Sequence, residues 1–225
     1  VGGSQAVVDG AVMQITDSGP NGYNLLASVS GGNTLRQVTN GTKTFYAIEV
    51  DADAIAAVTK ILKYSTDAGA TAAAQSLATP WTVVVVAKYM TVTPSGNIWV
   101  CDGRAATNRA GIFYRTSDSS FRMSDGTTGY SFNNTVHPYD NQWHVFAYGG
   151  VQPGSGVGAW VCIDNNFVHF SRTNLVRDGF MIGETYDASG TGKVQIAGAW
   201  ILSTDGYIAG LLERWNKAHS DTFGL

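Results

Sequence analysis

Charged residues are scarce in this chain of 225 residues: they make up 14% of it, where an average protein has about a quarter. Hydrophobic residues reach 44% and aromatic residues 11%. A disordered protein needs the opposite balance, so we expect a folded, globular body. One domain suits the length, because all-β sandwiches commonly use about 200–250 residues in one piece.

Basic stripes and long apolar runs are also absent. Fourteen basic and seventeen acidic residues give a net charge of −3, and the arginines are scattered, so nucleic-acid binding is not expected. The longest apolar run, from Val83 to Ala87, has the length of a strand and falls short of the about 20 residues of a membrane span. Residues Val1 to Gln5 have neither the basic start nor the apolar segment of a signal peptide, so none is expected.

Only two cysteines are present, Cys101 and Cys162. Both lie in apolar, strand-like stretches, which favours two small buried side chains. A disulfide would require their strands to be neighbours, and that alternative stays open. Neither cysteine has a second cysteine or a histidine at the spacing of a zinc site.

Short apolar stretches and turn-forming residues alternate from residue 81 onward. The dipeptides Asp125-Gly126 and Asn165-Asn166 predict tight hairpins. Strands at such short intervals, with turns between them, are typical of a sandwich or barrel. The expected strands span residues 81–89, 97–101, 111–116, 120–124, 142–148, 157–164, 167–170, 180–183 and 194–202.

The C-terminal residues predict one helix. Asp205 suits its first turn, and Tyr207, Leu211 and Trp215 form one apolar stripe. We expect this helix, over residues 203–218, to lie on the sandwich.

The first 80 residues give weaker signals. Residues 45–50 predict a strand, and Ile55, Val58 and Leu62 share one face of a short helix expected over 54–63. Residues 67–79 are rich in Ala, Thr and Ser and suit a loop or a second short helix. We therefore expect one domain over 1–225: N-terminal strands with an Ala-rich insertion to residue 80, a main sandwich over 81–202, and the C-terminal helix over 203–218.

Three stretches of the second half carry a family resemblance. They are Gln142 to Ala147 with its Trp-His pair, Ala159 to Asn165, and Phe180 to Gly183 together with residues 196–202. These resemble the concanavalin A-like lectin/glucanase superfamily in its laminin-G-like branch, and residues 80–88 resemble the strand that opens the main sheet there. The resemblance covers about residues 80–218. It implies an all-β jelly-roll sandwich of two antiparallel sheets with a short C-terminal helix, a fold frequent in phage tail and capsid proteins.

Carboxylate pairs, which glycoside hydrolases need, are scarce. The chain has three glutamates, and only Glu49 has further acids, Asp51 and Asp53, at the alternating spacing of one strand face. A retaining glycosidase places its two carboxylates about 5 Å apart. We favour a strand end that runs into an acidic N-cap over a glycosidase pair or a cation site.

Lyase chemistry on this fold would need a histidine and a tyrosine for proton transfer and an arginine beside them. His144, Tyr148, Tyr114 and Arg115 could supply such groups, and alternation places His144 and Tyr148 on one face of their strand. His144 is also the strand histidine typical of the resembling family, where its role is structural. We favour that structural role.

Calcium is the one cofactor that the sequence leaves open. Domains of the resembling family often hold it at the rim of the sandwich through Asp, Asn and backbone oxygens. Asp102, Asp118, Asp125 and Asp164 are carboxylates at loop edges, but no regular ligand spacing links them. We favour turn-forming aspartates, with no metal or cofactor bound.

Three functions suit such a chain. The first is a non-catalytic virion surface module of the capsid-decoration or tail-fibre kind, with a structural role and contacts to host glycans. The second is a free-standing carbohydrate-binding module or lectin. The third, a polysaccharide lyase or glycoside hydrolase, is disfavoured by the scarcity of paired carboxylates. We favour the first, which predicts a virion-surface or extracellular location and partners among other virion proteins or further copies of the chain, without nucleic-acid binding or membrane insertion.

Polar and aromatic residues near turns are the best candidates for ligand contact. Most tryptophans fall within strands and are expected in the core, whereas tyrosine and arginine near turns keep a polar tip available. The predicted ligand-binding residues are Arg104, Asn108, Arg109, Tyr130, Tyr139, Asp140 and Tyr186.

Overall fold

The computed structural model describes residues 10–16, 18, 24–74, 80–90, 95–104, 106, 109, 111–124, 129–131, 140–150, 158–164, 166–170, 178–203, 219 and 222–225. Its strands are β1 (Gln14–Ile15), β2 (Leu25–Leu26), β3 (Asn33–Asn40), β4 (Lys43–Asp51), β5 (Lys63–Tyr64), β6 (Trp81–Tyr89), β7 (Ile98–Asp102), β8 (Gly111–Arg115), β9 (Ser120–Ser124), β10 (Gly129–Ser131), β11 (His144–Gly150), β12 (Ala159–Ile163), β13 (Asn166–Phe170), β14 (Met181–Ile182) and β15 (Lys193–Leu202). Three 3₁₀ turns accompany them: η1 (Ala52–Ala54), η2 (Val58–Lys60) and η3 (Thr116–Asp118).

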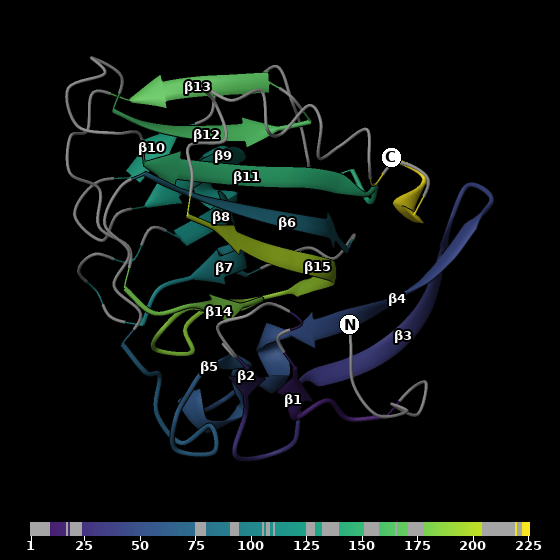
Figure 1. The fold of residues 1–225 in the computed structure, drawn as a ribbon, viewed down its shortest axis with the longest axis vertical. Helices are drawn as coiled ribbons and strands as arrows, with labels where there is room; N and C mark the ends of the chain where they lie inside the picture. Colours follow the sequence, from purple (N-terminus) through teal and green to yellow (C-terminus); the bar gives the residue numbers. More distant parts are fainter. Residues whose placement is uncertain are drawn as a thin grey trace.

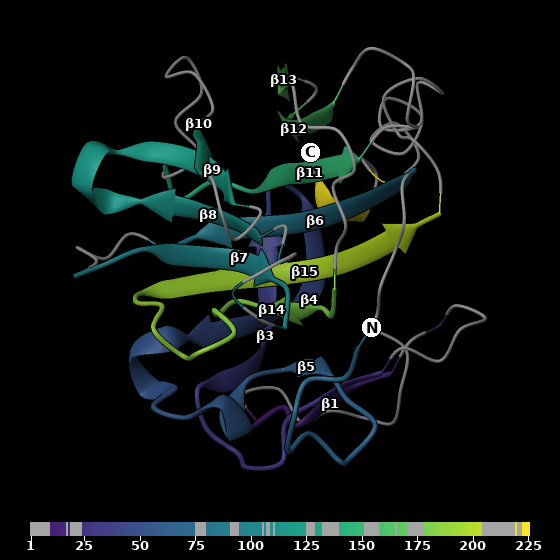
Figure 2. The ribbon, with the colours of Figure 1, turned by 90° about the vertical axis from the view of Figure 1, so that its left-hand side faces the viewer.

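The strands form two antiparallel sheets that pack face to face (Figures 1 and 2). Over the described residues, the eight-stranded sheet has the order β1-β2-β5-β14-β7-β8-β9-β10, and the seven-stranded sheet has the order β13-β12-β11-β6-β15-β4-β3. The strand pairs in both sheets are antiparallel and many join strands distant in sequence, as in a jelly roll. The predicted all-β sandwich, the fold that the concanavalin A-like resemblance implied, is confirmed.

Strand β6 explains why the centre of the seven-stranded sheet is apolar on both sides. Val83 and Val85 point into the core between the sheets, while Val84 and Val86 point to the opposite face. All four side chains are fully buried, and each such burial stabilises the fold by about 1.5–3 kcal/mol. A β-branched run with no polar face is therefore a covered central strand, as the sequence predicts.

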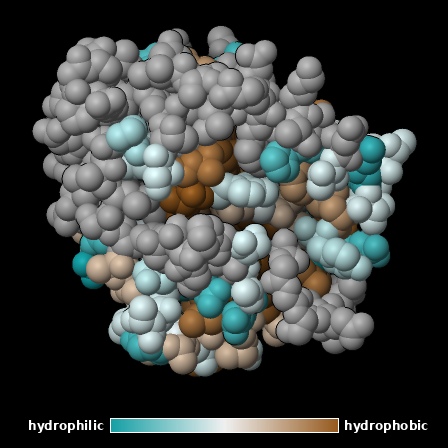
Figure 3. Space-filling view, in the orientation of Figure 1, coloured by the Kyte–Doolittle hydropathy of each residue, from teal (hydrophilic) through white to brown (hydrophobic). Residues whose placement is uncertain are grey.

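A second apolar cluster lies on the outer face of the seven-stranded sheet. Trp160 and Cys162 of β12 belong to it, together with Phe45 of β4 and Phe223 near the C-terminus. The rings of Phe45 and Phe223 meet edge to face with centroids 5.3 Å apart. Figure 3 shows apolar side chains gathered near the middle of this face. The helix expected over 203–218 lies almost wholly outside the described residues.

The two cysteines are buried and are not joined by a disulfide. Cys101 belongs to β7 of the eight-stranded sheet and faces the core between the sheets, whereas Cys162 belongs to β12 of the other sheet and faces outward. Their strands are not neighbours, so the disulfide alternative does not apply in this structure.

The helix expected over 54–63 is wrong. The chain instead forms η1 and η2 and then enters β5. The three residues expected on one helical face are separated, since Ile55 and Leu62 are buried in the core while Val58 is 40% exposed. Pairing of β5 with β2 and β14 competes with a helix for the same backbone groups. Lys63, buried in β5, donates from Nζ to the Val58 carbonyl at 2.6 Å and so closes the second turn.

Residues 67–74 of the Ala-rich stretch form turns and irregular chain, and residues 75–79 lie outside the described part. No helix in the described part of the chain has the length and apolar character needed to cross a membrane.

Candidate functional site

The outer face of the eight-stranded sheet carries aromatic and arginine side chains. On β7, β8 and β9, the residues on either side of Trp99, Phe113 and Arg122 face the core between the sheets, so alternation turns these three outward. Trp99 lies opposite Phe113, and Phe113 lies opposite Arg122, in the strand register. The three side chains therefore form one row across the sheet.

Four side chains stack at one end of this row. The rings of Trp99 and Phe113 are nearly parallel, with centroids 4.2 Å apart. The guanidinium of Arg109 lies 4.3 Å from the Trp99 ring centre and 4.9 Å from the Tyr186 ring centre, held between the two rings by cation–π contacts. Trp99 and Phe113 are only 6% and 7% exposed, so their rings are no open stacking platform, and the polar groups of Arg109 and Tyr186 are what a partner would meet.

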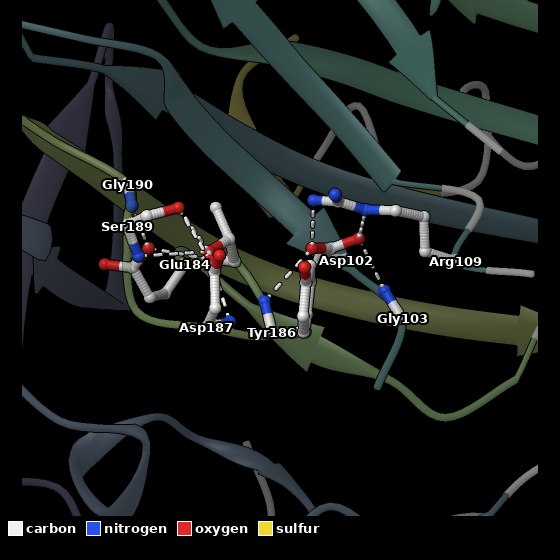
Figure 4. A network of polar contacts seen from close by, with 9 residues as sticks. Asp102, Gly103, Arg109, Glu184, Tyr186, Asp187, Ser189 and Gly190 are labelled. Atoms are coloured by element: carbon white, nitrogen blue, oxygen red, sulfur yellow. Dashed lines mark hydrogen bonds and ion pairs between the residues drawn. The ribbon is translucent and has the colours of Figure 1, made fainter. Parts of the chain in front are cut away.

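Asp102 fixes the guanidinium of Arg109 in this position (Figure 4). Arg109 donates from Nε to Oδ1 at 2.8 Å and from Nη2 to Oδ2 at 2.5 Å, a bidentate pair. The backbone N–H groups of Gly103 and Tyr186 donate to the same carboxylate. Complete burial raises the pKa of Asp102 to about 6, and these four donors keep the carboxylate ionised at neutral pH.

Glu184 lies next to this network, in the loop after β14, and is fully buried. Its Oε1 accepts from the backbone N–H groups of Thr185 at 2.7 Å and Gly190 at 2.6 Å, while Oε2 has no partner in the described part of the chain. Gly190 is required for this arrangement, since a Cβ there would overlap Oε1. Burial, with the charges of Asp187 and Asp102 nearby, raises the pKa of Glu184 to about 7.

The other end of the row holds a cluster of charges at the tip of the β8–β9 hairpin. Asp118 binds both Arg115 and Arg122, the latter at 2.6 Å, and accepts from Ser120 Oγ at 2.6 Å. The two guanidinium groups hold the pKa of Asp118 far below its ordinary value. We call these three residues, Arg115, Asp118 and Arg122, the arginine clamp.

Three of the predicted ligand residues lie at one corner of this face. Arg109 and Tyr186 contact each other, and Arg104 follows Gly103 directly, with its Nε bound to Asp178 Oδ2 at 2.6 Å. Asp140 lies elsewhere, beside His144 of β11. The backbone of Tyr130 lies in β10, paired with Met123, whereas Asn108 and Tyr139 lie outside the described residues.

The carboxylates at the end of β4 are engaged in ion pairs and a side-chain hydrogen bond. Glu49 binds Arg36 at 3.1 Å and accepts from Gln195 at 2.9 Å, and Asp51 binds Lys193 at 2.8 Å. The strand end runs into the turn η1, as expected, and Asp51 occupies the N-cap position, but its side chain makes no capping hydrogen bond.

The residues considered for lyase chemistry do not converge. His144 bonds through both ring nitrogens, Nδ1 to Asp164 at 2.5 Å and Nε2 to Asp140 at 3.0 Å. Tyr148 and Tyr114 face the core between the sheets, while Arg115 belongs to the arginine clamp on the outer face.

The aspartates considered for calcium are likewise apart. Asp102 binds Arg109, Asp118 lies in the arginine clamp and Asp164 binds His144, while Asp125 lies outside the described residues. In the part of the chain that can be described, no three His, Cys, Asp or Glu side chains are grouped to hold a metal ion.

Sequence reasoning missed Trp99, Phe113, Arg122 and Glu184 as members of the site. The first three have the pattern of ordinary strand residues. Alternation assigns residues to the two faces of a strand but does not show which face lies between the sheets. Glu184 could have been noticed as one of only three glutamates in a chain of low charge.

Comparisons with known proteins give weak likenesses. No family model and no curated protein matches the chain. Among solved structures, it is similar to the alginate lyase from Corynebacterium sp. (11% identity over 70% of this chain and 76% of that one, TM-score 0.43) and to an alginate lyase of polysaccharide lyase family 7 (9%, 84% and 81%, TM-score 0.43). It is also similar to a GH16 protein of Bacteroides ovatus in complex with an oligosaccharide product (11%, 76% and 85%, TM-score 0.40). With TM-scores below 0.5, the function of this chain has to follow from its own residues.

Proposed function

We propose that this chain is a non-catalytic, glycan-binding surface module that takes its ligand at the outer face of the eight-stranded sheet, next to Arg109. The observation that carries the proposal is the fixed guanidinium of Arg109. Two hydrogen bonds to Asp102 and two flanking rings hold it, while no hydrogen bond of its Nη1 atom is found within the described residues and its side chain is 14% exposed.

A guanidinium held in this way suits recognition of sugar oxygens. Its donors are already oriented, so binding costs little side-chain entropy. The hydroxyl of Tyr186 and the guanidinium of Arg104 flank the same corner and can add further hydrogen bonds. Because the Trp99 and Phe113 rings are covered, the site would bind through polar groups and not through ring stacking.

The test is affinity electrophoresis of the whole chain through gels containing polysaccharides, preceded by a glycan array. We expect retardation that Arg109→Lys lowers by about tenfold or more in affinity, because lysine keeps the charge but loses the bidentate bond. Arg36→Gln, an arginine variant on the other sheet, is the matched control and should migrate as wild type. Absence of binding to every glycan on the array would refute the proposal, as would wild-type affinity in Arg109→Lys.

A second candidate function, assembly into a virion surface or other oligomer, is favoured by the β3–β4 hairpin. Figure 1 shows this hairpin extending past its neighbouring strands, and Tyr46 on it is 47% exposed. Residues 10–12 bond to the edge of β3 at Asn33 and Leu35. Alternation turns the backbone groups of Gln37 and Thr39 to the same edge, where no bond to them is found within the described residues.

An open strand edge of this kind can pair with another chain. If a second copy or another virion protein pairs there, Gln37→Lys should shift the solution mass, measured by light scattering, toward the monomer. Thr44→Lys places the same charge on the neighbouring strand, away from the edge, and should leave the mass unchanged. A monomeric wild type, or equal masses for both variants, would exclude self-assembly through this edge.

A further inference from the structure

The arginine clamp stands on the same sheet face as Arg109 but plays no part in holding the aromatic stack. Arg122 follows Phe113 in the row that begins at Trp99, so it lies two strands away from Trp99. Neighbouring strands are about 4.8 Å apart, which separates the two ends of the row by about 10 Å. One extended ligand on this face would therefore meet both ends.

The clamp holds more positive than negative charge. Arg115 and Arg122 share the single carboxylate of Asp118, which leaves a net charge of about +1 in a chain whose total is −3. Ser120 takes part by donating to Asp118 and accepting from Arg122 Nε at 2.9 Å, so both guanidinium planes have fixed partners. A local positive charge held rigidly in an acidic protein favours an anionic partner.

Hydrogen-bonding capacity is also left over. A guanidinium has five N–H groups, and Arg115 and Arg122 each use only Nε and Nη2 in the described part of the chain. The side chains of Arg115 and Arg122 are 36% and 15% exposed, so both are partly accessible from solvent. Planar, parallel donors of this kind match the two oxygens of a carboxylate or sulfate.

We infer that the ligand of this face is an acidic glycan, whose carboxylate or sulfate groups bind the arginine clamp while its neutral oxygens bind at Arg109. This inference rests on the proposed function and adds the chemical class of the ligand. Asp118 sets the strength of the site, since it orients both arginines yet cancels one of their two charges. Binding is therefore selective for acidic over neutral chains and weakens as salt screens the clamp.

The test measures affinity for three soluble probes: polygalacturonate, dextran sulfate and neutral dextran. We expect binding to one or both acidic probes that is at least about tenfold tighter than to dextran, and that falls as salt rises from 0.05 to about 0.5 M. Arg122→Gln should weaken acidic-probe binding by about 10- to 100-fold, the loss expected for a charge-assisted hydrogen bond. Arg115→Gln, at the more exposed position, is the second variant should Arg122→Gln fold poorly.

The outcomes separate this inference from the proposed function. Arg36→Gln removes an arginine that is paired with Glu49 on the other sheet and should bind as wild type. Two results would overturn the assignment of an acidic ligand and leave glycan binding at Arg109 intact. One is equal binding of dextran and the acidic probes. The other is wild-type binding in Arg115→Gln and Arg122→Gln while Arg109→Lys is impaired. If none of these probes and no glycan on the array binds, both fail. A preference between the two acidic probes assigns the anion as carboxylate or sulfate.

Discussion

The two outer faces of this sandwich have opposite chemistry. The seven-stranded sheet presents Val84, Trp160 and Cys162 outward, and an apolar cluster covers them. The eight-stranded sheet presents Trp99 and Arg122 outward, and there ion pairs and cation–π contacts take the place of an apolar cover. Both sheets share the inner core, so the difference lies only in the residues at alternate positions of the strands.

This difference separates stability from recognition. Apolar burial has no direction and does not depend on salt, so it suits a face that only has to be covered. Fixed guanidinium groups stabilise the fold less, because their desolvation costs free energy, but their N–H donors stay oriented for a ligand. We therefore expect substitutions on the seven-stranded face to change stability alone, and substitutions on the eight-stranded face to change stability, its pH dependence and binding together.

The largest effect should come from Trp160→Ala. This side chain is fully buried against Phe167 and Gly149, so its removal leaves a large cavity and should lower the free energy of unfolding by about 4–5 kcal/mol. Urea unfolding at low and high salt measures the loss, which should be the same at both.

The matched control is Trp99→Ala, which removes the same ring from the other face. It should also destabilise the protein, but it alone should weaken glycan binding, because Arg109 loses one of its two flanking rings. A folded Trp160→Ala variant that had lost glycan binding would contradict the division between the two faces.

Asp102→Asn should have the next largest effect. It leaves the Arg109 guanidinium, whose side chain is 14% exposed, without its charge partner, and the breaking of such a buried pair costs about 3–4 kcal/mol. Chemical denaturation at pH 7 measures it.

Replacing both partners tests whether the cost lies in the unpaired charge. The double variant Asp102→Asn with Arg109→Gln should recover part of the stability while still failing to bind glycan. If the double variant were as unstable as the sum of the two single variants, the pair would not be coupled, and the fixed position of Arg109 would need another explanation.

The strands of the second half could be predicted from the sequence because each is short, β-rich and bounded by turn residues. Residues 81–89 were expected as a strand covered on both sides, and β6 has those bounds. The hairpin of β12 and β13 and the long strand β15 follow the same local rule. Local pattern and tertiary pairing agree in all of these strands.

The rest depended on contacts between distant residues. Residues 54–63 have a helical period, but β5 is drawn into a sheet by β14, which lies more than a hundred residues later. The site has the same origin: Asp102 ends β7, Arg109 lies in the next loop, and Tyr186 follows β14. No spacing along the chain reports that these three groups meet, although Arg109 and Tyr186 could be selected by their type.

Glu184 should give the eight-stranded face a pH dependence of stability between pH 5 and 8, a range in which the Glu49 ion pair of the other face should show none. Its pKa is raised from 4.5 to about 7, so its contribution to stability is complete below pH 4.5 and is lost as the pH rises to about 7. The loss amounts to about 3 kcal/mol, and Glu184→Gln should remove it, leaving the smaller slopes of Asp102 and His144. Urea unfolding at pH 5, 6, 7 and 8 measures the slope.

Glu49→Gln is the control for this pH dependence. The pKa of Glu49 is lowered by its bonds to Gln195 and Arg36, in spite of partial burial, so its contribution is lost only as the pH falls below its ordinary range. The variant should therefore keep the wild-type slope between pH 5 and 8. An unchanged slope in Glu184→Gln would mean that the buried carboxyl is not the titrating group.

The smallest effect should come from His144, where the seven-stranded sheet carries its own ion pairs. Both ring nitrogens bond to carboxylates, and only the protonated imidazole donates from both. These bonds, opposed by burial, raise the pKa of His144, so its contribution is complete below the ordinary value of 6.5 and is lost as the pH rises through the raised pKa. The Asp164 and Asp140 side chains are 40% and 43% exposed, which limits the effect to about 1 kcal/mol. His144→Gln should remove this loss of stability, while His169→Gln, at an exposed histidine of β13, should keep it. An NMR titration of the histidines and unfolding on either side of pH 6.5 measure the two effects. They would show whether the charge of His144 stabilises the seven-stranded sheet without changing ligand binding on the other sheet.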